Sequence, residues 1–397
     1  MVLRKPHYFF FLLIRMLLLN PTGSTAAAMA DNNMEADALL HWKSTLPQPS
    51  QSLLVSWNAS INHCLWLGLN CDPSSSIIAL NLSNFLISGT LHSLNFSLLP
   101  NLDTVKFRNN TLHGNIPPSI TSLSKLTVLD LSNNLLSGNI PPPLGRVMSL
   151  RFLDLSYNSF SGSIPGSIGS LPNLTFLYLN KNVLSGSIPE GIGNLNSLQE
   201  LFLHSNSLTG SIPGTIGNMT SLAKLWLQQN QIHGSIPPGI GKLGSLRELD
   251  LSANYLNGSI PGTVGNLTGL NFLYFYGNQL SGTIPWEVGN MQNLYHFELL
   301  NNELTGQIPS SIGNMTALSV LYLFENHLSG PIPAEIGNLK SLQELAVYTN
   351  NLTRSIPSTV VGHHLPELMD TLRQSWPTRW KPRKRATFTA SEWSRWK

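Results

Sequence analysis

Few residues in this 397-residue chain have the types and spacing that catalysis requires. The chain contains no H-E-x-x-H, G-x-S-x-G, P-loop or protein-kinase signature. Its 11 histidines are scattered, and the one adjacent pair, His363-His364, lies near the C-terminus. Two cysteines are too few for a disulfide scaffold or a four-cysteine zinc site. We therefore expect no enzyme activity, no cofactor and no metal site.

Binding chemistry is better represented, because aromatic and carboxylate side chains recur beside regularly spaced leucines. Alternation with buried leucines would turn these side chains toward solvent, where contiguous aromatic area usually marks an interaction site. Aromatic anchors with intervening carboxylates and histidines suit an extended peptide. The alternative is that aromatic residues are simply favoured in strands. The candidate ligand-binding residues are Asp154, Phe176, Tyr178, Glu200, Phe202, His204, Trp226, Asp250, Phe272, Tyr274, Tyr276, Glu298, Tyr322 and Phe324.

A repeat of 24 residues positions these side chains. Similar segments begin at Leu126, Leu150 and Leu174, and an irregular first unit begins at Leu80 with Phe85 in the place of the repeat asparagine. No single unit can bury its leucines alone, so the units must stack. The repeat asparagine stands in one register at Asn110, Asn134, Asn158, Asn182, Asn206, Asn230, Asn254, Asn278, Asn302, Asn326 and Asn350.

Each repeat position has a physical role. The L-x-x-L-x-L segment predicts a short strand with one buried face, and identical strands would stack as a parallel sheet. The asparagine amide can satisfy turn backbone groups that would otherwise be unpaired. Gly138 suits a turn with permissive dihedrals, and Ile140-Pro141 favours extended backbone. Ile168-Gly169 predicts a short helical turn that ends at its glycine.

The repeat resembles the plant-type leucine-rich repeat, whose pattern is L-x-x-L-x-L-x-x-N-x-L-x-G-x-I-P-x-x-I-G-x-L-x-x. The match runs from Leu102 to about Pro357. The resemblance implies an α/β fold: a right-handed superhelical solenoid with a parallel β-sheet on its concave face. Short 3-10 or helical turns and extended segments would form its convex face.

Upstream of the repeats, the chain resembles the N-terminal cap of plant leucine-rich-repeat receptors. The residues that carry this resemblance are Ala38, Leu39, Leu40, Trp42, Leu53, Trp57, Cys64, Trp66, Gly68 and Cys71. Residues 35–44 have helical spacing of apolar side chains. A solenoid needs such a cap over its first repeat. In an exported chain, we expect Cys64 and Cys71 to form a disulfide.

The two ends of the chain differ from the repeats. Residues 1–30 have the order of a secretory signal peptide, with Arg4 and Lys5 before an apolar run; an uncleaved signal anchor is the alternative. Residues 31–79 are assigned to the cap, 80–357 to about twelve repeats and 358–397 to a basic, Trp-rich tail. We expect the tail to be disordered. The alternatives are RNA or membrane contact, or a truncated or frame-shifted reading of a longer receptor gene.

Charge and glycosylation motifs point to an extracellular protein. The net charge of +3 resides at the ends, whereas residues 31–357 carry twelve basic and seventeen acidic side chains, which argues against nucleic-acid binding. No stretch after the signal peptide predicts a membrane span. The N-x-S/T motifs lie at Asn58, Asn81, Asn95, Asn109, Asn173, Asn218, Asn257, Asn266, Asn314 and Asn351.

The resemblance implies a secreted or cell-surface-derived module, located in the apoplast, that binds a peptide or protein ligand in defence or development signalling. A co-receptor ectodomain would be a further partner, and full-length relatives would lie at the plasma membrane. One alternative is an inhibitor of a secreted cell-wall-degrading enzyme, similar to polygalacturonase-inhibiting proteins. Another is a non-functional truncated product.

Overall fold

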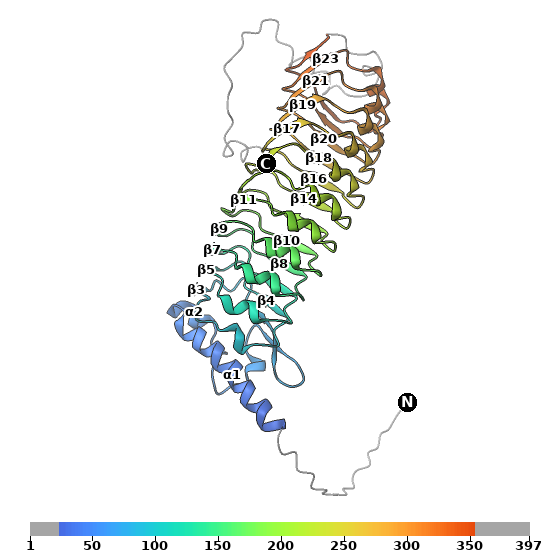
Figure 1. Cartoon of the computed structure of the whole chain (residues 1–397). Helices are drawn as coiled ribbons and strands as arrows, with labels where there is room; N and C mark the ends of the chain where they lie inside the picture. Colours follow the sequence, from blue (N-terminus) through green and yellow to red (C-terminus); the bar gives the residue numbers. More distant parts are fainter. Residues whose placement is uncertain (1–23, 354–397) are drawn as a thin grey trace, which may run out of the picture.

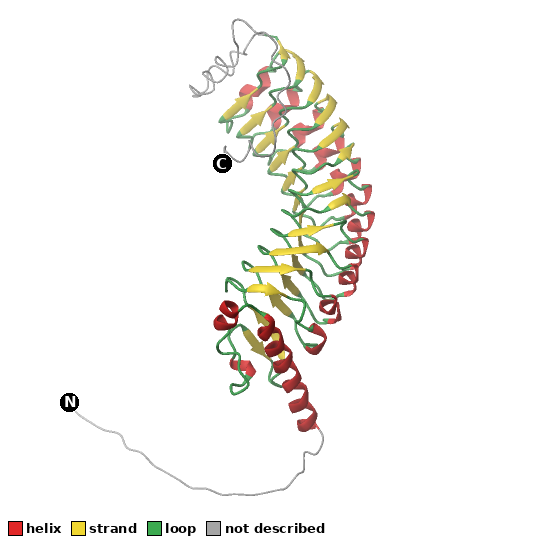
Figure 2. Cartoon of the chain, turned by 90° about the vertical axis from the view of Figure 1, so that its left-hand side faces the viewer, coloured by secondary structure: helices red, strands yellow, loops and turns green. Residues whose placement is uncertain are grey.

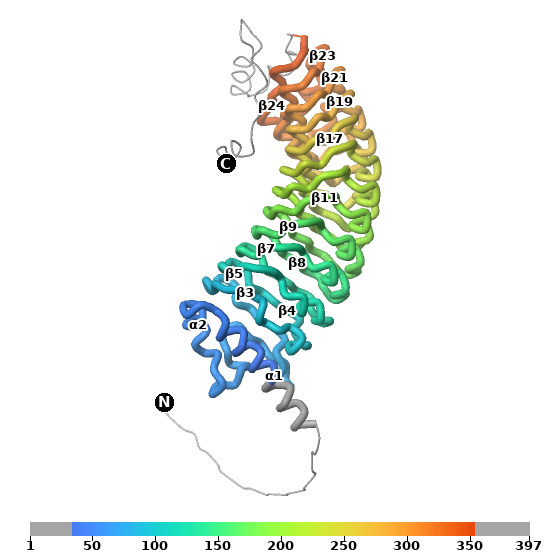
Figure 3. Tube along the Cα trace, turned by 60° about the vertical axis from the view of Figure 1, so that its left-hand side comes forward, coloured from blue at the N-terminus to red at the C-terminus, as the bar shows by residue number. Residues whose placement is uncertain are grey.

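The computed structural model describes residues 24–353, which form one curved stack of coils (Figure 1). Predicted features before residue 24 and after residue 353, namely most of the signal peptide and the whole basic tail, lie outside the described residues. Each coil is one repeat, of 25 residues in the first coil and 24 in those that follow, and successive coils follow one another along the stack in chain order (Figure 3). The predicted leucine-rich-repeat solenoid is confirmed.

The stack begins with a cap built from two helices and a short strand. Helix α1 spans Ser24–Thr45, which includes the helix expected over residues 35–44, and α2 spans Gln48–Leu53. The Trp42 and Trp57 rings are buried, with ring centroids 6.0 Å apart. The Glu35 carboxylate accepts hydrogen bonds from the Ser76 hydroxyl (2.7 Å) and the Ile77 N–H (2.8 Å). These contacts join α1 to the first coil and cover its apolar end.

One continuous sheet runs the length of the stack. β1 pairs antiparallel with β2, and every later pairing is parallel. Parallel register places residues 24 apart side by side, as in Tyr178, Phe202 and Trp226. The strands are β1 (Leu69–Cys71), β2 (Ile77–Asn81), β4 (Thr104–Lys106), β6 (Val128–Asp130), β8 (Phe152–Asp154), β10 (Phe176–Tyr178), β12 (Glu200–Phe202), β14 (Lys224–Trp226), β16 (Glu248–Asp250), β18 (Phe272–Tyr274), β20 (His296–Glu298), β22 (Val320–Tyr322) and β24 (Glu344–Ala346).

A second set of short parallel strands follows the repeat asparagines. They pair from coil to coil in smaller sheets, and the glycine in this segment has positive φ, as at Gly138 (φ +76°). Gly138 therefore adopts the backbone conformation that was expected of a turn glycine. The strands are β3 (Ser88–Thr90), β5 (Thr111–Gly114), β7 (Leu135–Asn139), β9 (Ser159–Ser161), β11 (Ser185–Ser187), β13 (Ser207–Thr209), β15 (His233–Gly234), β17 (Tyr255–Ser259), β19 (Gln279–Thr283), β21 (Glu303–Gly306), β23 (His327–Gly330) and β25 (Asn351–Leu352).

Short 3-10 helices lie along the outer side of the arc (Figure 2). Because a helical turn is wider than a strand, the coils spread on this side and the main sheet takes the inner, concave side. Apart from η1 (His63–Leu65) in the cap, these helices are η2 (Phe96–Leu98), η3 (Pro118–Ser122), η4 (Pro142–Arg146), η5 (Gly166–Ser170), η6 (Glu190–Asn194), η7 (Gly214–Asn218), η8 (Pro238–Lys242), η9 (Gly262–Asn266), η10 (Trp286–Asn290), η11 (Ser310–Asn314) and η12 (Ala334–Asn338).

The glycine inside these helices has a different role from the one predicted. Gly169 lies within η5 and has no positive φ, so it is not a left-handed helix stop. A Cβ atom there would lie 2.1 Å from the carbonyl oxygen of Gly191 in the next coil. A Cβ atom on Gly193 would lie similarly close to the next coil, at 2.3 Å from the Thr215 carbonyl oxygen. This glycine is required because adjacent coils touch backbone to backbone.

The repeat asparagines tie each coil to the one before it. The Asn206 amide donates to the carbonyls of Leu203 and Leu179, both at 3.0 Å, and its Oδ1 accepts from the Leu184 N–H at 3.0 Å. Equivalent bonds are made from Asn110 to Asn350. The apolar interior runs beside this column from Leu39 to Val347 as one continuous core. The asparagines therefore satisfy turn groups that the leucines cannot.

Candidate ligand-binding face

The candidate face is the concave side of the main sheet and consists of three columns of side chains. The central column is the last residue of each strand, such as Trp226 or Tyr274, and its neighbours are two residues earlier and two residues later. The intervening leucines, such as Leu225 and Leu273, are buried. Side chains on the columns therefore project away from the core, and Tyr178, Trp226 and Tyr274 are half-buried rather than part of it.

An aromatic ladder crosses β8 to β14. The Tyr178 and Phe202 rings stack with centroids 4.7 Å apart, and the Phe202 and Trp226 rings stack at 4.3 Å. Phe176 extends the group, with its centroid 5.9 Å from that of Phe152. Parallel strand spacing of about 4.8 Å is close to a ring-stacking distance, so identical register produces the ladder. The result is a continuous apolar strip over four strands.

A second aromatic group covers β18 and β20 at the other side of an acidic interval. Phe272 lies 5.6 Å from His296 between ring centroids, and Tyr274 lies 6.5 Å from Tyr276. Further along, Tyr322 and Phe324 are 6.1 Å apart, and Phe324 stacks on Tyr348 at 4.4 Å. All of these rings are half-buried.

Carboxylates lie between and beside the rings. The Lys224 ammonium bridges Glu200 (3.5 Å) and Glu248 (3.6 Å), its neighbours in the same column. The Tyr178 hydroxyl donates to Glu200 at 2.6 Å. Burial raises the pKa of Tyr178, and the hydrogen bond and charge of Glu200 raise it further. Tyr178 is therefore a neutral hydrogen-bond donor at physiological pH.

Glu298 is a carboxyl of this face with a strongly raised pKa. Burial raises its pKa to about 7, and Asp250 and Glu344 add to the shift. His296 lies 3.5 Å from Glu298, and burial lowers the pKa of the imidazole. The histidine is consequently neutral at pH 7 and does not offset the carboxylates.

Two of the candidate residues are buried rather than exposed, contrary to expectation. The Asp154 carboxylate accepts hydrogen bonds from the Ser156 N–H (2.9 Å) and hydroxyl (2.6 Å), which fold it against its own turn. His204 is 9% exposed, and the Trp226 ring packs against it edge to face with centroids 5.5 Å apart. Asp154 therefore shapes the turn, and His204 supports the ladder from beneath. The other twelve candidates are half-buried.

Other residues of the face were not among the candidates. Lys224, Glu248, His296 and Glu344 occupy the outward columns and make the polar contacts of the site. The 24-residue register already places them there. Tyr295 lies just before β20 and stacks on His296 at 5.1 Å; it is the first x of the L-x-x-L-x-L segment, where the alternation of buried and outward residues has not yet begun.

The glycosylation motifs leave most of this face uncovered. Among the ten predicted acceptor asparagines, Asn81 lies on a strand of the main sheet, and the others lie elsewhere in the described chain. Asn218, Asn266 and Asn314 end η7, η9 and η11 on the convex side. The concave strands β4 to β24 thus carry no such motif.

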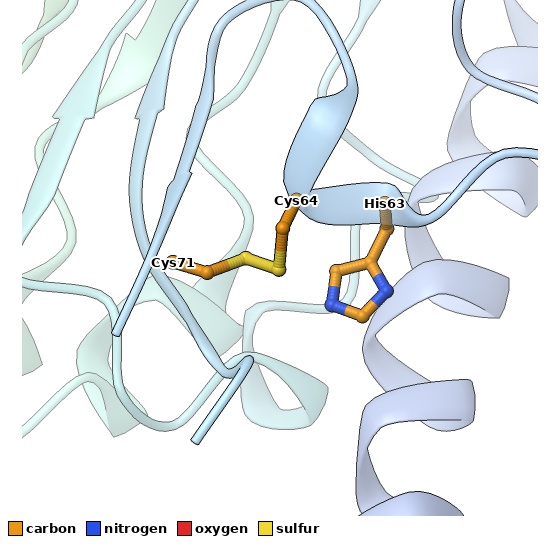
Figure 4. Close-up of side chains that lie close together, drawn as sticks. All are labelled: His63, Cys64 and Cys71. Carbon is orange, nitrogen blue, oxygen red and sulfur yellow. A yellow bond between two sulfur atoms is a disulfide. The ribbon is translucent and has the colours of Figure 1, made fainter. Parts of the chain in front are cut away.

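The cap holds the described residues that come nearest to a metal-ligand set. His63, Cys64 and Cys71 lie close together (Figure 4), with their ligand atoms within 4.8 Å of one another. Cys64 and Cys71 form a disulfide, so their sulfurs are bonded to each other instead of being available as thiolates. The His63 Nε2 lies 2.9 Å from the Ser75 carbonyl oxygen. The disulfide and the His63 contact thus stabilise the structure of the cap.

Comparisons with known proteins agree with this architecture. Residues 32–72 match the family described as the leucine rich repeat N-terminal domain, and residues 104–233 match the leucine-rich repeat region. Four single-repeat matches cover 245–267, 269–291, 293–315 and 317–339. Together these matches cover more than half of the chain. Among the described residues, no helix combines the length and apolarity that crossing a membrane would demand.

Similar proteins include plant receptors. A probable leucine-rich repeat receptor-like protein kinase of Arabidopsis thaliana is 43% identical over 116 residues, which is 28% of this chain and 10% of that protein. The ectodomain of the Arabidopsis receptor kinase HAESA, solved with the peptide hormone IDA and the co-receptor SERK1, is 38% identical with a TM-score of 0.71. That match covers 81% of this chain and 54% of HAESA. A leucine-rich-repeat protein of Leptospira interrogans is 30% identical, with a TM-score of 0.54, over 75% of this chain and 81% of that one. The chain thus spans about half of the receptor ectodomain and a small part of the curated kinase.

Proposed function

Because the chain belongs to the leucine-rich-repeat family, with a cap and repeats like those of plant receptor ectodomains, we propose that it is a non-catalytic recognition module. It binds a secreted peptide or protein ligand on the concave face of the main sheet. The proposal extends to a co-receptor ectodomain as a second partner and to an extracellular location.

One observation carries the proposal: the aromatic ladder from Phe152 to Trp226, continued by the rings around Tyr274, retains solvent access on a sheet face. Rings are ordinarily placed in the core when burial alone is being optimised, since each can bury about 150–250 Å². Here the core is filled by leucines, and the rings stack on one another outside it. Such preordered aromatic surface is the usual centre of an interface.

Three further features support an extracellular ligand. The Cys64–Cys71 disulfide is of a kind that persists in oxidising compartments. The predicted glycosylation motifs avoid β4 to β24, so attached glycans would leave the concave face open. The HAESA ectodomain, which was solved with a peptide hormone and a co-receptor, shares the fold over most of this chain.

A binding screen tests the proposal. The glycosylated, secreted protein is immobilised and exposed to a library of secreted plant peptides, and binders are quantified by biolayer interferometry. Trp226→Ala and Tyr274→Ala are expected to weaken binding at least tenfold, because interface aromatic anchors contribute about 2 kcal/mol or more.

Matched controls replace a tryptophan and a tyrosine that lie outside the concave face. Trp286→Ala acts on the convex helix η10, where the ring is 65% exposed, and Tyr255→Ala acts on β17, where the ring is 54% exposed. Both should leave affinity unchanged. If binders respond equally to the control and the concave variants, or if no binder is found, the proposal is wrong. Inhibition of a pectin-degrading enzyme without peptide binding would instead favour the inhibitor hypothesis.

A further inference from the structure

Exposed apolar side chains are concentrated on the cap. Of the fourteen large apolar side chains that are exposed in the described residues, six belong to the cap. Met34 is one of them, and the other five run from the end of α2 to the start of β1. We call these five the cap patch: Leu53, Val55, Ile61, Leu65 and Leu67. Val55 and Leu65 are each 75% exposed, which is unusual for side chains without a function at a surface.

Hydrogen bonds hold the segment that carries the cap patch together. The Trp57 and Trp66 rings are buried and stack with centroids 5.6 Å apart. The Leu67 N–H donates to the Ser56 hydroxyl (2.9 Å), and the Leu67 carbonyl accepts from the Trp57 indole N–H (2.8 Å). The Ile61 carbonyl accepts from the Trp66 indole N–H (3.1 Å). The segment is therefore one compact unit, with the two tryptophans inside it and the cap patch outside.

A predicted glycosylation acceptor, Asn58, lies in the middle of this segment. Its N–H donates to the Ser56 carbonyl (3.1 Å) and its carbonyl accepts from the Ile61 N–H (3.2 Å), so Val55 and Ile61 flank it in two consecutive turns. The Asn58 Oδ1 accepts from the Ser60 N–H at 3.0 Å. Its Nδ2, the atom to which a sugar is attached, makes no hydrogen bond within the described part of the chain.

Another acceptor, Asn314, has different surroundings. It ends η11 on the convex side, and its apolar neighbours Ile312 and Met315 are fully buried. A glycan on Asn314 would therefore meet polar surface, whereas a glycan on Asn58 would begin among exposed apolar side chains.

From this placement we propose that an N-linked glycan on Asn58 covers the cap patch and serves as the outer layer of the cap. The proposal rests on the extracellular location proposed above. Attachment joins Nδ2 to the anomeric carbon of the first N-acetylglucosamine; Nδ2 loses a proton, and the pyrophosphate of a lipid-linked oligosaccharide donor leaves. The C–H faces of the first sugars then pack on Val55 and Ile61 while their hydroxyls stay in water. A bulky glycan at this position also keeps a protein partner off the cap patch.

Removal of the acceptor tests the proposal. The protein is produced with its glycans by secretion from plant cells, and glycopeptide mass spectrometry measures occupancy at Asn58 and Asn314. Asn58→Gln is compared with Asn314→Gln by the fluorescence of the apolar dye ANS and by size-exclusion chromatography with light scattering. We expect Asn58→Gln to raise the ANS fluorescence about threefold or more and to self-associate as its concentration rises. Asn314→Gln should match the wild type in both measurements.

A rescue variant separates exposure of the cap patch from misfolding. Val55→Ser and Leu65→Ser, added together to Asn58→Gln, remove the most exposed apolar side chains of the cap patch. This triple variant should return the ANS fluorescence and the molar mass to the wild-type values. Circular dichroism of each variant establishes that the fold is intact.

The failures are distinguishable. If Asn58 carries no glycan while other acceptor motifs do, the proposal is wrong and the extracellular location stands. If wild type binds ANS as strongly as Asn58→Gln, the glycan leaves the cap patch open and the proposal is wrong. If the rescue variant still binds ANS, the dye reports misfolding and not the cap patch, which again contradicts the proposal. If no motif is glycosylated, both this proposal and the extracellular location fail.

Discussion

The side-chain amide of Asn206 donates to the carbonyl oxygen of Leu179 at 3.0 Å, across the boundary between two coils. The same side chain bonds Leu203 and accepts from Leu184, so a single residue satisfies backbone groups that come from three places in the chain.

Asn206→Ala should therefore be strongly destabilising. It leaves buried carbonyls and an N–H without partners, and each such group costs about 1–3 kcal/mol. We expect a loss of about 2–4 kcal/mol in the free energy of unfolding, measured by urea denaturation. Asn196→Ala, at an exposed loop position, should change stability by less than about 0.5 kcal/mol. Similar losses in both variants would contradict the bridging role.

Two glycines of neighbouring 3-10 helices should respond oppositely to a methyl group. Gly193→Ala places Cβ 2.3 Å from the Thr215 carbonyl oxygen, whereas Gly214→Ala meets nothing within 4 Å. We expect Gly193→Ala to destabilise the protein by about 2 kcal/mol or more. Gly214→Ala should be neutral or stabilise it by up to about 1 kcal/mol through the unfolded state. Thermal unfolding of the pair provides the measurement; equal melting temperatures would refute the close coil contact.

The residue that precedes each repeat asparagine adopts left-handed backbone. Ala253 has φ +51°, and Gly277 occupies the equivalent place with φ +64°. A left-handed non-glycine residue costs about 1–2 kcal/mol, partly offset by its lower entropy when unfolded. Ala253→Gly should thus raise stability by about 0.5–1 kcal/mol, and Gly277→Ala should lower it similarly. Denaturant midpoints that move in the same direction would be inconsistent with this.

Glu298 should make stability depend on pH in a defined direction. Its pKa is about 7 in the folded protein, against an ordinary value of 4.5, because burial and the nearby carboxyls of Asp250 and Glu344 disfavour the charge. Between these values the folded state holds a proton that the unfolded state releases, so stability falls as pH rises from about 4.5 to 7.

Glu298→Gln removes that dependence. The variant should match wild type at pH 4 and be more stable at pH 8, by about 1–2 kcal/mol. Chemical denaturation at the two pH values measures the difference, and Glu335→Gln on the convex face should show no comparable divergence. A variant less stable than wild type at pH 8 would show that ionised Glu298 is stabilised by its neighbours.

The sequence predicts the fold to the level of single hydrogen-bonding residues, because one period specifies every coil. The strand at Leu225, the asparagine at Asn230 and the turn at Gly234 follow from register alone. How deeply each side chain of the concave face is buried does not follow from register. Alternation assigns His204 to the outward side, but it does not show that the imidazole is only 9% exposed and packs against the Trp226 ring.

Two other features could not be predicted from the sequence pattern. The D-x-S spacing of Asp154 and Ser156 does not reveal that the carboxylate folds back on its turn. The sequence also does not show why a repeat position is glycine. Gly138 adopts positive φ, whereas Gly169 is needed because the backbone of the next coil lies too close for a Cβ atom. The distinction depends on where the next coil lies.

From Asn134 onward, the residues that pair or bond between neighbouring coils are separated by a constant 22, 24 or 27 positions, so the stack consists of interchangeable units of fixed length. Excising any 24 consecutive residues from its middle would rejoin chemically equivalent seams, whereas excising 23 would misalign every later rung against the preceding ones. The concave surface can therefore be lengthened or shortened only in whole increments, each of which adds or removes one set of three outward side chains. The length of the concave face and the chemistry of its side chains can thus change independently: the number of repeats sets the length, and the outward residues of each strand set the chemistry.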